Sequence, residues 1–174
     1  MGTMNVWNTK QAKAYEYKVS VNEELLKKAS GKKISMFIQH NKSKVDPKRV
    51  GFSAVVTVEG RYTAIEISGI SYDGSINRSH IRAFLIAVET LYHFVKTTDL
   101  VLYIGNHFLY KILKYDWALN WLRNGFLRQD GYPVMNQDLM QPLAKILYAN
   151  EFVTCIKEMK DFRTSYNRFI EQDY

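Results

Sequence analysis

Short runs of alternating hydrophobic and polar residues occupy the first part of the chain, and such runs are typical of β-strands. They cover residues 15–21, 32–39, 50–58 and 61–71. Glu59 and Gly60 separate the last two runs and predict a tight reversal of the chain. Residues 33–69 are therefore expected to form three antiparallel strands joined by short loops. A short helix is expected before them, with Asn22 as its cap and Gly31 beyond its end.

Residues 77–96 carry hydrophobic side chains at the spacing of a helix rather than a strand. Asn77 is the expected N-terminal cap. His80 lies one turn before Phe84, at the buried edge of the apolar stripe, with Arg78 and Arg82 beside it. The helical pattern alone gives no reason for an imidazole there. The stripe consists of Ile81, Phe84, Leu85, Val88, Leu91 and Val95.

The rest of the chain alternates apolar strands with helices. Residues 99–105, DLVLYIG, are almost continuously apolar and predict a buried strand. A last strand is expected at residues 151–157, and helices are expected at 106–113, 117–123, 136–148 and 162–171. The resulting order is βββ-α-β-α-α-α-β-α, which predicts an α/β domain with a five-stranded mixed sheet flanked by helices. A chain of 174 residues fits a single such domain.

The composition is that of an ordinary globular protein, with 47% hydrophobic and 24% charged residues. No apolar run approaches the length that spans a membrane, and the N-terminal residues lack the apolar core of a signal peptide. Cys155 is the single cysteine, which excludes an internal disulfide and favours a cytoplasmic (intracellular) protein. No contact with a membrane is expected, and no motif indicates a cofactor.

The positive charge is concentrated in the first part of the chain. Residues 1–50 contain 11 Lys/Arg and 4 Asp/Glu, whereas residues 51–174 contain 13 of each. The whole formal charge of +7 therefore comes from the first 50 residues. A basic segment on a neutral body is typical of a protein that binds a polyanion, but a lysine-rich solubilising surface gives the same count.

The most specific motif lies between Trp117 and Leu147. WALNWLRNGF keeps a W-x-x-N-W-x-x-x-G pattern, with Phe126 in place of a second tryptophan. PVMNQDLM then keeps P-V-x-N-x-D-L, with Met140 in place of a last tryptophan. Together they resemble type 1 ribonuclease H, and INRSHIRAFL resembles the N-R-M-E-L helix of that family. The matching residues are Trp117, Asn120, Trp121, Gly125, Pro133, Val134, Asn136, Asp138, Leu139 and Leu143.

The resemblance covers residues 32–171 and implies a ribonuclease H-like domain at 32–174, preceded by a short basic N-terminal extension at 1–31. In the family, four carboxylates hold two magnesium ions that activate water and stabilise the leaving oxygen. Position by position, those carboxylates fall at Gln39, His80, Gly105 and Asn167. Magnesium requires oxygen ligands, which these residues do not supply as a set. The sequence thus predicts no metal, no cofactor and no enzymatic activity.

Two other arrangements of ligands remain open at this point. A rebuilt metal site would draw on Glu66, Asp73 and Asp161, although alternation turns Glu66 away from the layer of its neighbours and Asp73 has the setting of a turn residue. Three imidazoles bind zinc in many proteins, and the resemblance places three histidines near the former site. These are His40, His80 and His107. Separate histidines, each hydrogen-bonded or exposed, are the simpler interpretation.

The remaining candidates concern binding. The resemblance places Asn77 and Arg78 where the family has an Asn-Arg pair that precedes the metal-binding glutamate, and Arg123 and Arg128 in its substrate-gripping protrusion. A separate basic cluster lies in the loop after the first family strand: Lys42, Lys44, Lys48 and Arg49. We therefore predict a catalytically inactive protein that binds RNA, DNA or their hybrid through a basic surface. A protein-interaction module built on the same fold is the alternative, and the sequence leaves the oligomeric state open.

Overall fold

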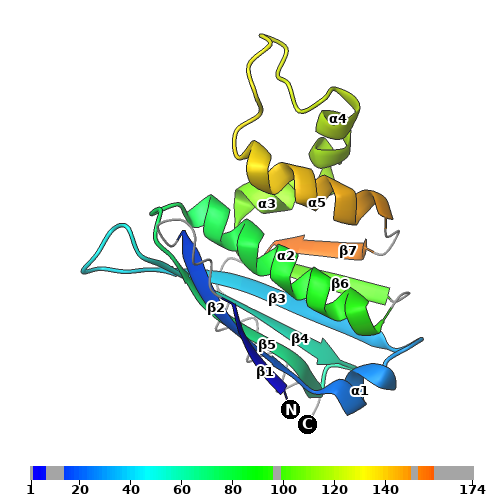
Figure 1. Cartoon of the computed structure of the whole chain (residues 1–174). Helices are drawn as coiled ribbons and strands as arrows, with labels where there is room; N and C mark the ends of the chain where they lie inside the picture. The colour runs from blue at the N-terminus through cyan, green and yellow to red at the C-terminus, as the bar shows by residue number, and fades with distance from the viewer. Residues whose placement is uncertain (1, 7–13, 96–98, 150–152, 159–174) are drawn as a thin grey trace.

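The computed structural model describes residues 2–6, 14–95, 99–149 and 153–158, and its centre is one seven-stranded sheet (Figure 1). The strand order is β1-β2-β5-β4-β3-β6-β7. The strands are β1 (Gly2–Val6), β2 (Tyr15–Val21), β3 (Lys33–Lys42), β4 (Val50–Val58), β5 (Tyr62–Ser71), β6 (Asp99–Ile104) and β7 (Val153–Glu158). The helices are α1 (Glu23–Lys27), α2 (Ile76–Phe94), α3 (His107–Lys114), α4 (Trp117–Arg123) and α5 (Gln137–Ala149). The helix predicted at residues 162–171 lies outside the described residues.

The predicted meander and its parallel neighbour are confirmed. β3 pairs antiparallel with β4, β4 pairs antiparallel with β5, and β6 runs parallel to β3. Glu59 and Gly60 reverse the chain with φ values of 54° and 73°, in a turn closed by the hydrogen bond from the Arg61 amide to the Val58 carbonyl at 3.3 Å. Alternation along β3 turns Ile34, Met36 and Ile38 into the core.

The N-terminal extension adds two strands to the five that the sequence predicts for the domain. β2 pairs antiparallel with β5, and β1 pairs with β2. Val19 is buried at 4% exposure, so the alternation of YEYKVSV places β2 on the core as well as in the ladder. Asn22 caps α1 as predicted, because its side-chain oxygen accepts a hydrogen bond from the Leu25 amide at 3.2 Å.

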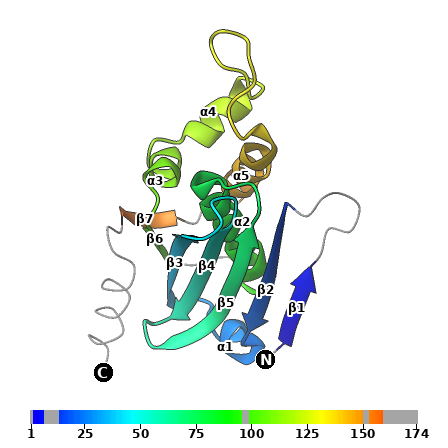
Figure 2. The ribbon, with the colours of Figure 1, turned by 90° about the vertical axis from the view of Figure 1, so that its left-hand side faces the viewer.

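The long helix α2 packs across β3, β4 and β5 and buries the predicted apolar stripe. Its cap is Ser75, whose hydroxyl accepts a hydrogen bond from the Arg78 amide at 3.1 Å, so the prediction of Asn77 as the cap is wrong. Figure 2 shows α3, α4 and α5 at one end of the molecule, with the loop between α4 and α5 projecting from the body. None of the described helices combines the length and the apolar content needed to cross a bilayer.

Candidate functional site

The candidate site lies where the C-terminal ends of β3 and β6 meet the first turns of α2. Gln39 and His40 are near the end of β3, His80 is in α2, and Gly105 directly follows β6. The Gly105 amide donates to the Ile38 carbonyl at 3.4 Å, which joins the two strand ends. The fold thus brings together three of the four positions inferred from the resemblance. Asn167 lies outside the described residues.

The residue of β3 that reaches α2 is His40, not Gln39. Successive side chains of a strand point to opposite faces, and Ile38 on the helix-covered face fixes the direction of His40. The Nδ1 atoms of His40 and His80 are 3.3 Å apart, and their ring centroids are 5.4 Å apart at 71°. One Nδ1 therefore carries a hydrogen atom and donates a hydrogen bond to the other. The resemblance places both histidines near the former site, but their direct hydrogen bond was not predicted, because it joins residues 40 positions apart.

Burial decides the charge of the two histidines. His80 is fully buried, and burial together with the neighbouring His40 lowers its pKa to about 3. Burial also lowers the pKa of His40. Both rings are thus neutral at pH 7. The Nε2 atom of His80 is buried and has no hydrogen-bond partner among the described residues.

The residues at this position do not fit a pair of magnesium ions. Magnesium selects carboxylate and other oxygen ligands in octahedral geometry, whereas the strand ends and α2 present imidazoles and an amide. Within the ranges that the structure describes, no group of three His, Cys, Asp or Glu residues is placed to hold a metal ion. His107 does not join His40 and His80 in such a group. Glu66 is exposed on β5 as predicted, and Asp161 lies outside the described ranges.

Asp73 belongs to an ion-pair network rather than to a metal site. The network consists of Asp73, Arg78, Arg82 and Asp138. Asp73 accepts from Arg78 at 3.1 Å and from Arg82 at 2.8 Å. Burial opposes ionisation of the Asp73 carboxyl, but hydrogen bonds from the Ser75 amide and from Arg82 and Arg78 keep its pKa below the ordinary value. The carboxylate is thus satisfied inside the protein.

Arg78 holds the start of α5 against the start of α2. Its guanidinium donates two hydrogen bonds to Asp138 and one to Asn136, at 3.1 Å, in addition to its bond with Asp73. The hydrogen bonds to Asp138 raise the pKa of Arg78 and lower the pKa of Asp138. Arg78 and Asp138 are both residues of the motifs that carry the resemblance. The charge of Arg78, a predicted nucleic-acid contact, is therefore compensated by the protein itself.

Asn77 lies at the edge of the site and is fixed by a second amide. The Asn106 side chain donates to Asn77 Oδ1 at 2.9 Å, while its own oxygen caps α3 by accepting from the Leu109 amide at 2.8 Å. This pairing orients Asn77 next to the ends of β3 and β6, where the resemblance places a contact to nucleic acid.

The predicted basic cluster forms the β3–β4 hairpin loop, at the same end of the sheet. We call Lys42, Lys44, Lys48 and Arg49 the basic loop. All four are exposed, and no carboxylate of the described residues lies within salt-bridge range of any of them. The loop is ordered by backbone bonds from Ser43 to Arg49, at 3.1 Å, and from Gly74 to Lys48, at 2.8 Å. The backbone that carries these cations is therefore held in place, and the cations remain exposed.

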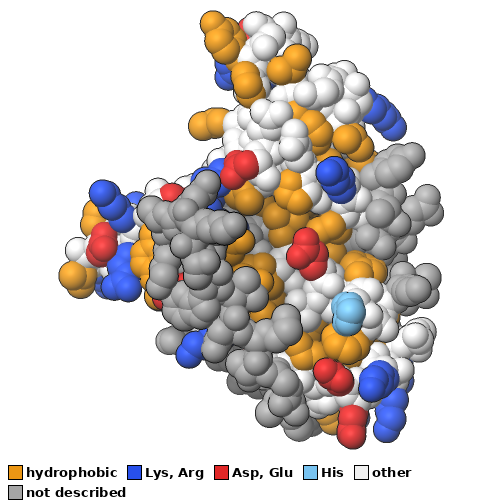
Figure 3. Space-filling model, in the orientation of Figure 1, with side chains coloured by type: hydrophobic (Ala, Val, Ile, Leu, Met, Phe, Trp, Pro, Cys, Tyr) orange, Lys and Arg blue, Asp and Glu red, His pale blue; other side chains and the backbone are white. Residues whose placement is uncertain are grey.

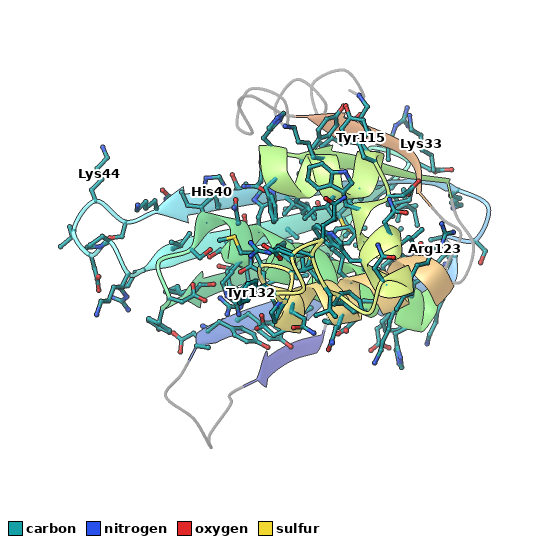
Figure 4. All side chains as sticks on the ribbon, turned by 90° about the horizontal axis from the view of Figure 1, so that it is seen from above. Lys33, His40, Lys44, Tyr115, Arg123 and Tyr132 are labelled. Atoms are coloured by element: carbon teal, nitrogen blue, oxygen red, sulfur yellow. The ribbon has the colours of Figure 1, made fainter. Side chains whose placement is uncertain are left out.

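The other cations lie elsewhere. β3 spans ten residues, so Lys33 at its start and Lys42 at its end are about 30 Å apart. Figure 4 shows Lys33 and Lys44 at opposite ends of the molecule, and Arg123 far from Lys44. Arg123 is exposed in α4, whereas Arg128 pairs with Asp130 at 2.8 Å. Trp117 and Trp121 are half-buried and pack on the core.

Comparison with known proteins finds relatives of this chain by sequence. No family model matches the chain. A protein named Ribonuclease H from Thermoanaerobacter sp. (strain X514) is 29% identical over 127 residues, which cover 73% of this chain and 78% of the relative. A Ribonuclease H from Caldanaerobacter subterraneus subsp. tengcongensis is 30% identical over 101 residues, which cover 58% of this chain and 63% of the relative.

Solved structures agree with these relatives. LC9-RNase H1, a type 1 RNase H with the type 2 active-site motif, superposes with a TM-score of 0.60 at 12% identity, over 81% of this chain and 69% of that one. The foamy viral protease-reverse transcriptase in complex with dsDNA gives 0.59 at 13% identity, over 84% and 92%. The chain has the ribonuclease H-like fold. LC11-RNase H1 in complex with an RNA/DNA hybrid gives 0.51 at 18% identity, over 78% and 90%.

The comparisons also correct one expectation. The sequence predicted that this ribonuclease H-like chain is not an enzyme, because the carboxylate positions hold other residues. That prediction is wrong: the relatives found by sequence are named for an enzyme, Ribonuclease H, and they match up to 73% of this chain. The inferred replacement of the four carboxylates bears on which residues can hold a metal ion. By itself it does not decide whether a ribonuclease H-like protein is an enzyme.

Proposed function

We propose that this protein binds nucleic-acid duplexes, with an RNA/DNA hybrid as the first candidate, along the end of the sheet that carries the basic loop and Asn77. The observation that carries the proposal is the set of four exposed cations without a carboxylate partner among the described residues. Such cations neutralise phosphates and release condensed counterions, which gives affinity independent of sequence.

Two further observations support the same surface. The Gly74 amide, in the loop before α2, donates a hydrogen bond to the Lys48 carbonyl of the basic loop. Asn77 is the second residue of α2, so the basic loop and the Asn77 side chain lie at the same end of the molecule. Neighbours with the same fold have been solved with dsDNA and with RNA/DNA hybrid. The relatives found by sequence are named Ribonuclease H, so we add hydrolysis of nucleic acid to the proposal.

The test is a salt titration with labelled RNA/DNA hybrid, duplex DNA, duplex RNA and single-stranded DNA. Four phosphate contacts to a duplex predict a log–log slope of affinity against salt of about −3.6. Replacing Lys42, Lys44, Lys48 and Arg49 together by Gln should remove most of this slope and weaken binding at least about 100-fold at about 0.1 M salt.

The chain offers a matched control. Changing Lys27, Lys28, Lys32 and Lys33 to Gln removes the same charge at the opposite end of β3 and should weaken binding less than about 3-fold, since exposed charges at that distance are screened. Equal losses of affinity in both variants would show that binding depends only on the net charge of the protein. Absence of binding by the unchanged protein at low salt would exclude the proposal.

Cleavage is measured in separate reactions on the same substrates, with magnesium or manganese and without chelator. The described residues bring together no group that fits a magnesium pair, so metal-dependent cleavage of the hybrid would show that the metal takes ligands beyond this arrangement. The binding result stands independently, because it is obtained in the presence of a chelator.

A further inference from the structure

The two strands of the N-terminal extension leave a strip of sheet beside α2. Neighbouring strands are about 4.8 Å apart, so β1 and β2 widen the sheet by about 10 Å. This is also the diameter of a helix with its side chains, about 10 Å. The described part of α2 packs on β3, β4 and β5, and Figure 1 shows none of the labelled helices lying over β1 and β2. As far as the described residues go, this strip is as wide as one more helix and carries none.

A groove of about 470 Å³ occupies this position. β2 forms one wall and α2 forms the other, with Val19 at 4% exposure as the deepest residue. Alternation along β2 turns Lys18 and Ser20 to the opposite face, where they line a different depression. The groove is lined by Tyr17, Val19, Val21, Ile86, Thr90 and Phe94, with Glu23, Glu89 and His93 at its margin. Apolar side chains therefore cover its interior.

The charge at the margin of the groove is negative. Glu23 and Glu89 are exposed and have no ion-pair partner within the described ranges. Figure 3 shows the hydrophobic band on this face, with acidic side chains and one histidine beside it. Among the described residues that line the groove, none is a lysine or an arginine. On a protein with a net charge of +7, this face repels a polyanion and attracts a cationic segment.

We propose that this groove binds an amphipathic helix of a partner protein, with apolar residues in the groove and Lys or Arg residues facing Glu23 and Glu89. Residues 17–21 of β2 and 86–94 of α2 each extend about 12 to 13 Å, which accommodates a little over two turns of such a helix. Anchors at positions i, i+3 or i+4, and i+7 would then lie against Val19, Ile86 and Phe94.

The test uses a library of displayed amphipathic helices with a fixed leucine stripe and flanking positions that vary among Lys, Arg, Gln and Glu. Selection on the intact protein should enrich Lys and Arg in the flanks. The selected helices should lose at least about 10-fold in affinity for Ile86→Lys, which places a charge in the groove. They should lose about 5-fold for Glu89→Lys.

Glu24→Lys is the matched control, because Glu24 is exposed on α1 and does not line the groove. Its affinity for the selected helices should stay within about 2-fold of the unchanged protein. A library without enrichment, enrichment that ignores the flanking charge, or helices that bind Ile86→Lys as well as the unchanged protein would each overturn the proposal. Self-association of the unchanged protein that Ile86→Lys abolishes would do so too, and would make a second copy the occupant. The proposal is independent of nucleic-acid binding.

Discussion

The β3–β4 hairpin loop and the first turns of α2 both carry several cationic or titratable side chains, yet the two regions use them in opposite ways. In the basic loop, four cations are exposed and have no carboxylate partner among the described residues. In α2, Arg82 is 4% exposed and paired with Asp73, Arg78 is held by Asp73 and Asp138, and His80 faces His40.

Depth in the fold explains the contrast. A buried charge requires a partner, because removing it from water without one costs several kcal/mol, about as much as the whole stability margin of a small domain. The same charge in an exposed loop remains solvated and is free to bind a phosphate. Counting charges along the sequence gives both regions equal weight, whereas in the structure the charges of one region are paired and those of the other are exposed.

The largest effect should come from breaking the paired region. Arg82→Ala removes the ion pair with Asp73, the hydrogen bond to Ser71 at 3.0 Å and the contact of the guanidinium with the Tyr15 ring at 4.8 Å. We expect the free energy of unfolding in urea to fall by about 3 kcal/mol. Lys44→Ala, in the exposed loop, should change it by less than about 0.5 kcal/mol. A loss below about 1 kcal/mol for Arg82→Ala would show that burial does not separate the two regions.

The second effect concerns the histidine pair and pH. The pKa of His80 is lowered to about 3 in the folded protein, so between pH 6.5 and 3 the unfolded chain binds a proton that the folded chain does not. Stability should therefore fall as the pH falls, by about 2 kcal/mol between pH 7 and pH 5. His80→Met should flatten this dependence in unfolding curves, and His93→Gln, at an exposed position, should leave it unchanged. An unchanged slope in His80→Met would mean that other groups dominate.

A single charge in the basic loop should have a smaller effect, on binding and not on stability. Lys44→Gln removes one phosphate contact and should weaken hybrid binding about 5-fold, or about 1 kcal/mol, at about 0.1 M salt. Lys33→Gln is the matched change at the other end of β3 and should weaken it less than about 2-fold. Anisotropy titrations at several salt concentrations measure both variants. If Lys33 proved the more important, the binding surface would lie at the opposite end of the sheet.

The smallest effect should come from converting a paired cation into a free one. Arg128 and Asp130 are both about half exposed and form an ion pair at 2.8 Å. Asp130→Asn should free Arg128 and tighten hybrid binding about 2-fold, or about 0.5 kcal/mol. The double variant with Arg128→Gln should lose this gain, which a double-mutant cycle measures. Tightening that persists in the double variant would assign the effect to net charge.

Much of the fold and part of the site followed from local sequence patterns. Alternation predicted β3, β4 and β5, and the apolar stripe predicted α2. Glu59 and Gly60 predicted the turn between β4 and β5. Such patterns are readable because the residues that decide them lie within a few positions of one another. The cap of α2 was misassigned because Ser75 and Asn77 both have capping side chains, and only the position of the first helical turn chooses between them.

By itself, the sequence of this chain determined the order of its helices and strands from β2 to β7, the position of its cations along the chain and the motif that resembles ribonuclease H. The tertiary structure decided which of those side chains remain free to act. His40 meets His80 across 40 positions, and Arg78 meets Asp138 across 60. Such partners are chosen by the packing of α2 on the sheet and against α5, not by any local preference. Pairing and burial set pKa and charge, so the division between a solvated loop and a satisfied interior exists only in the folded chain.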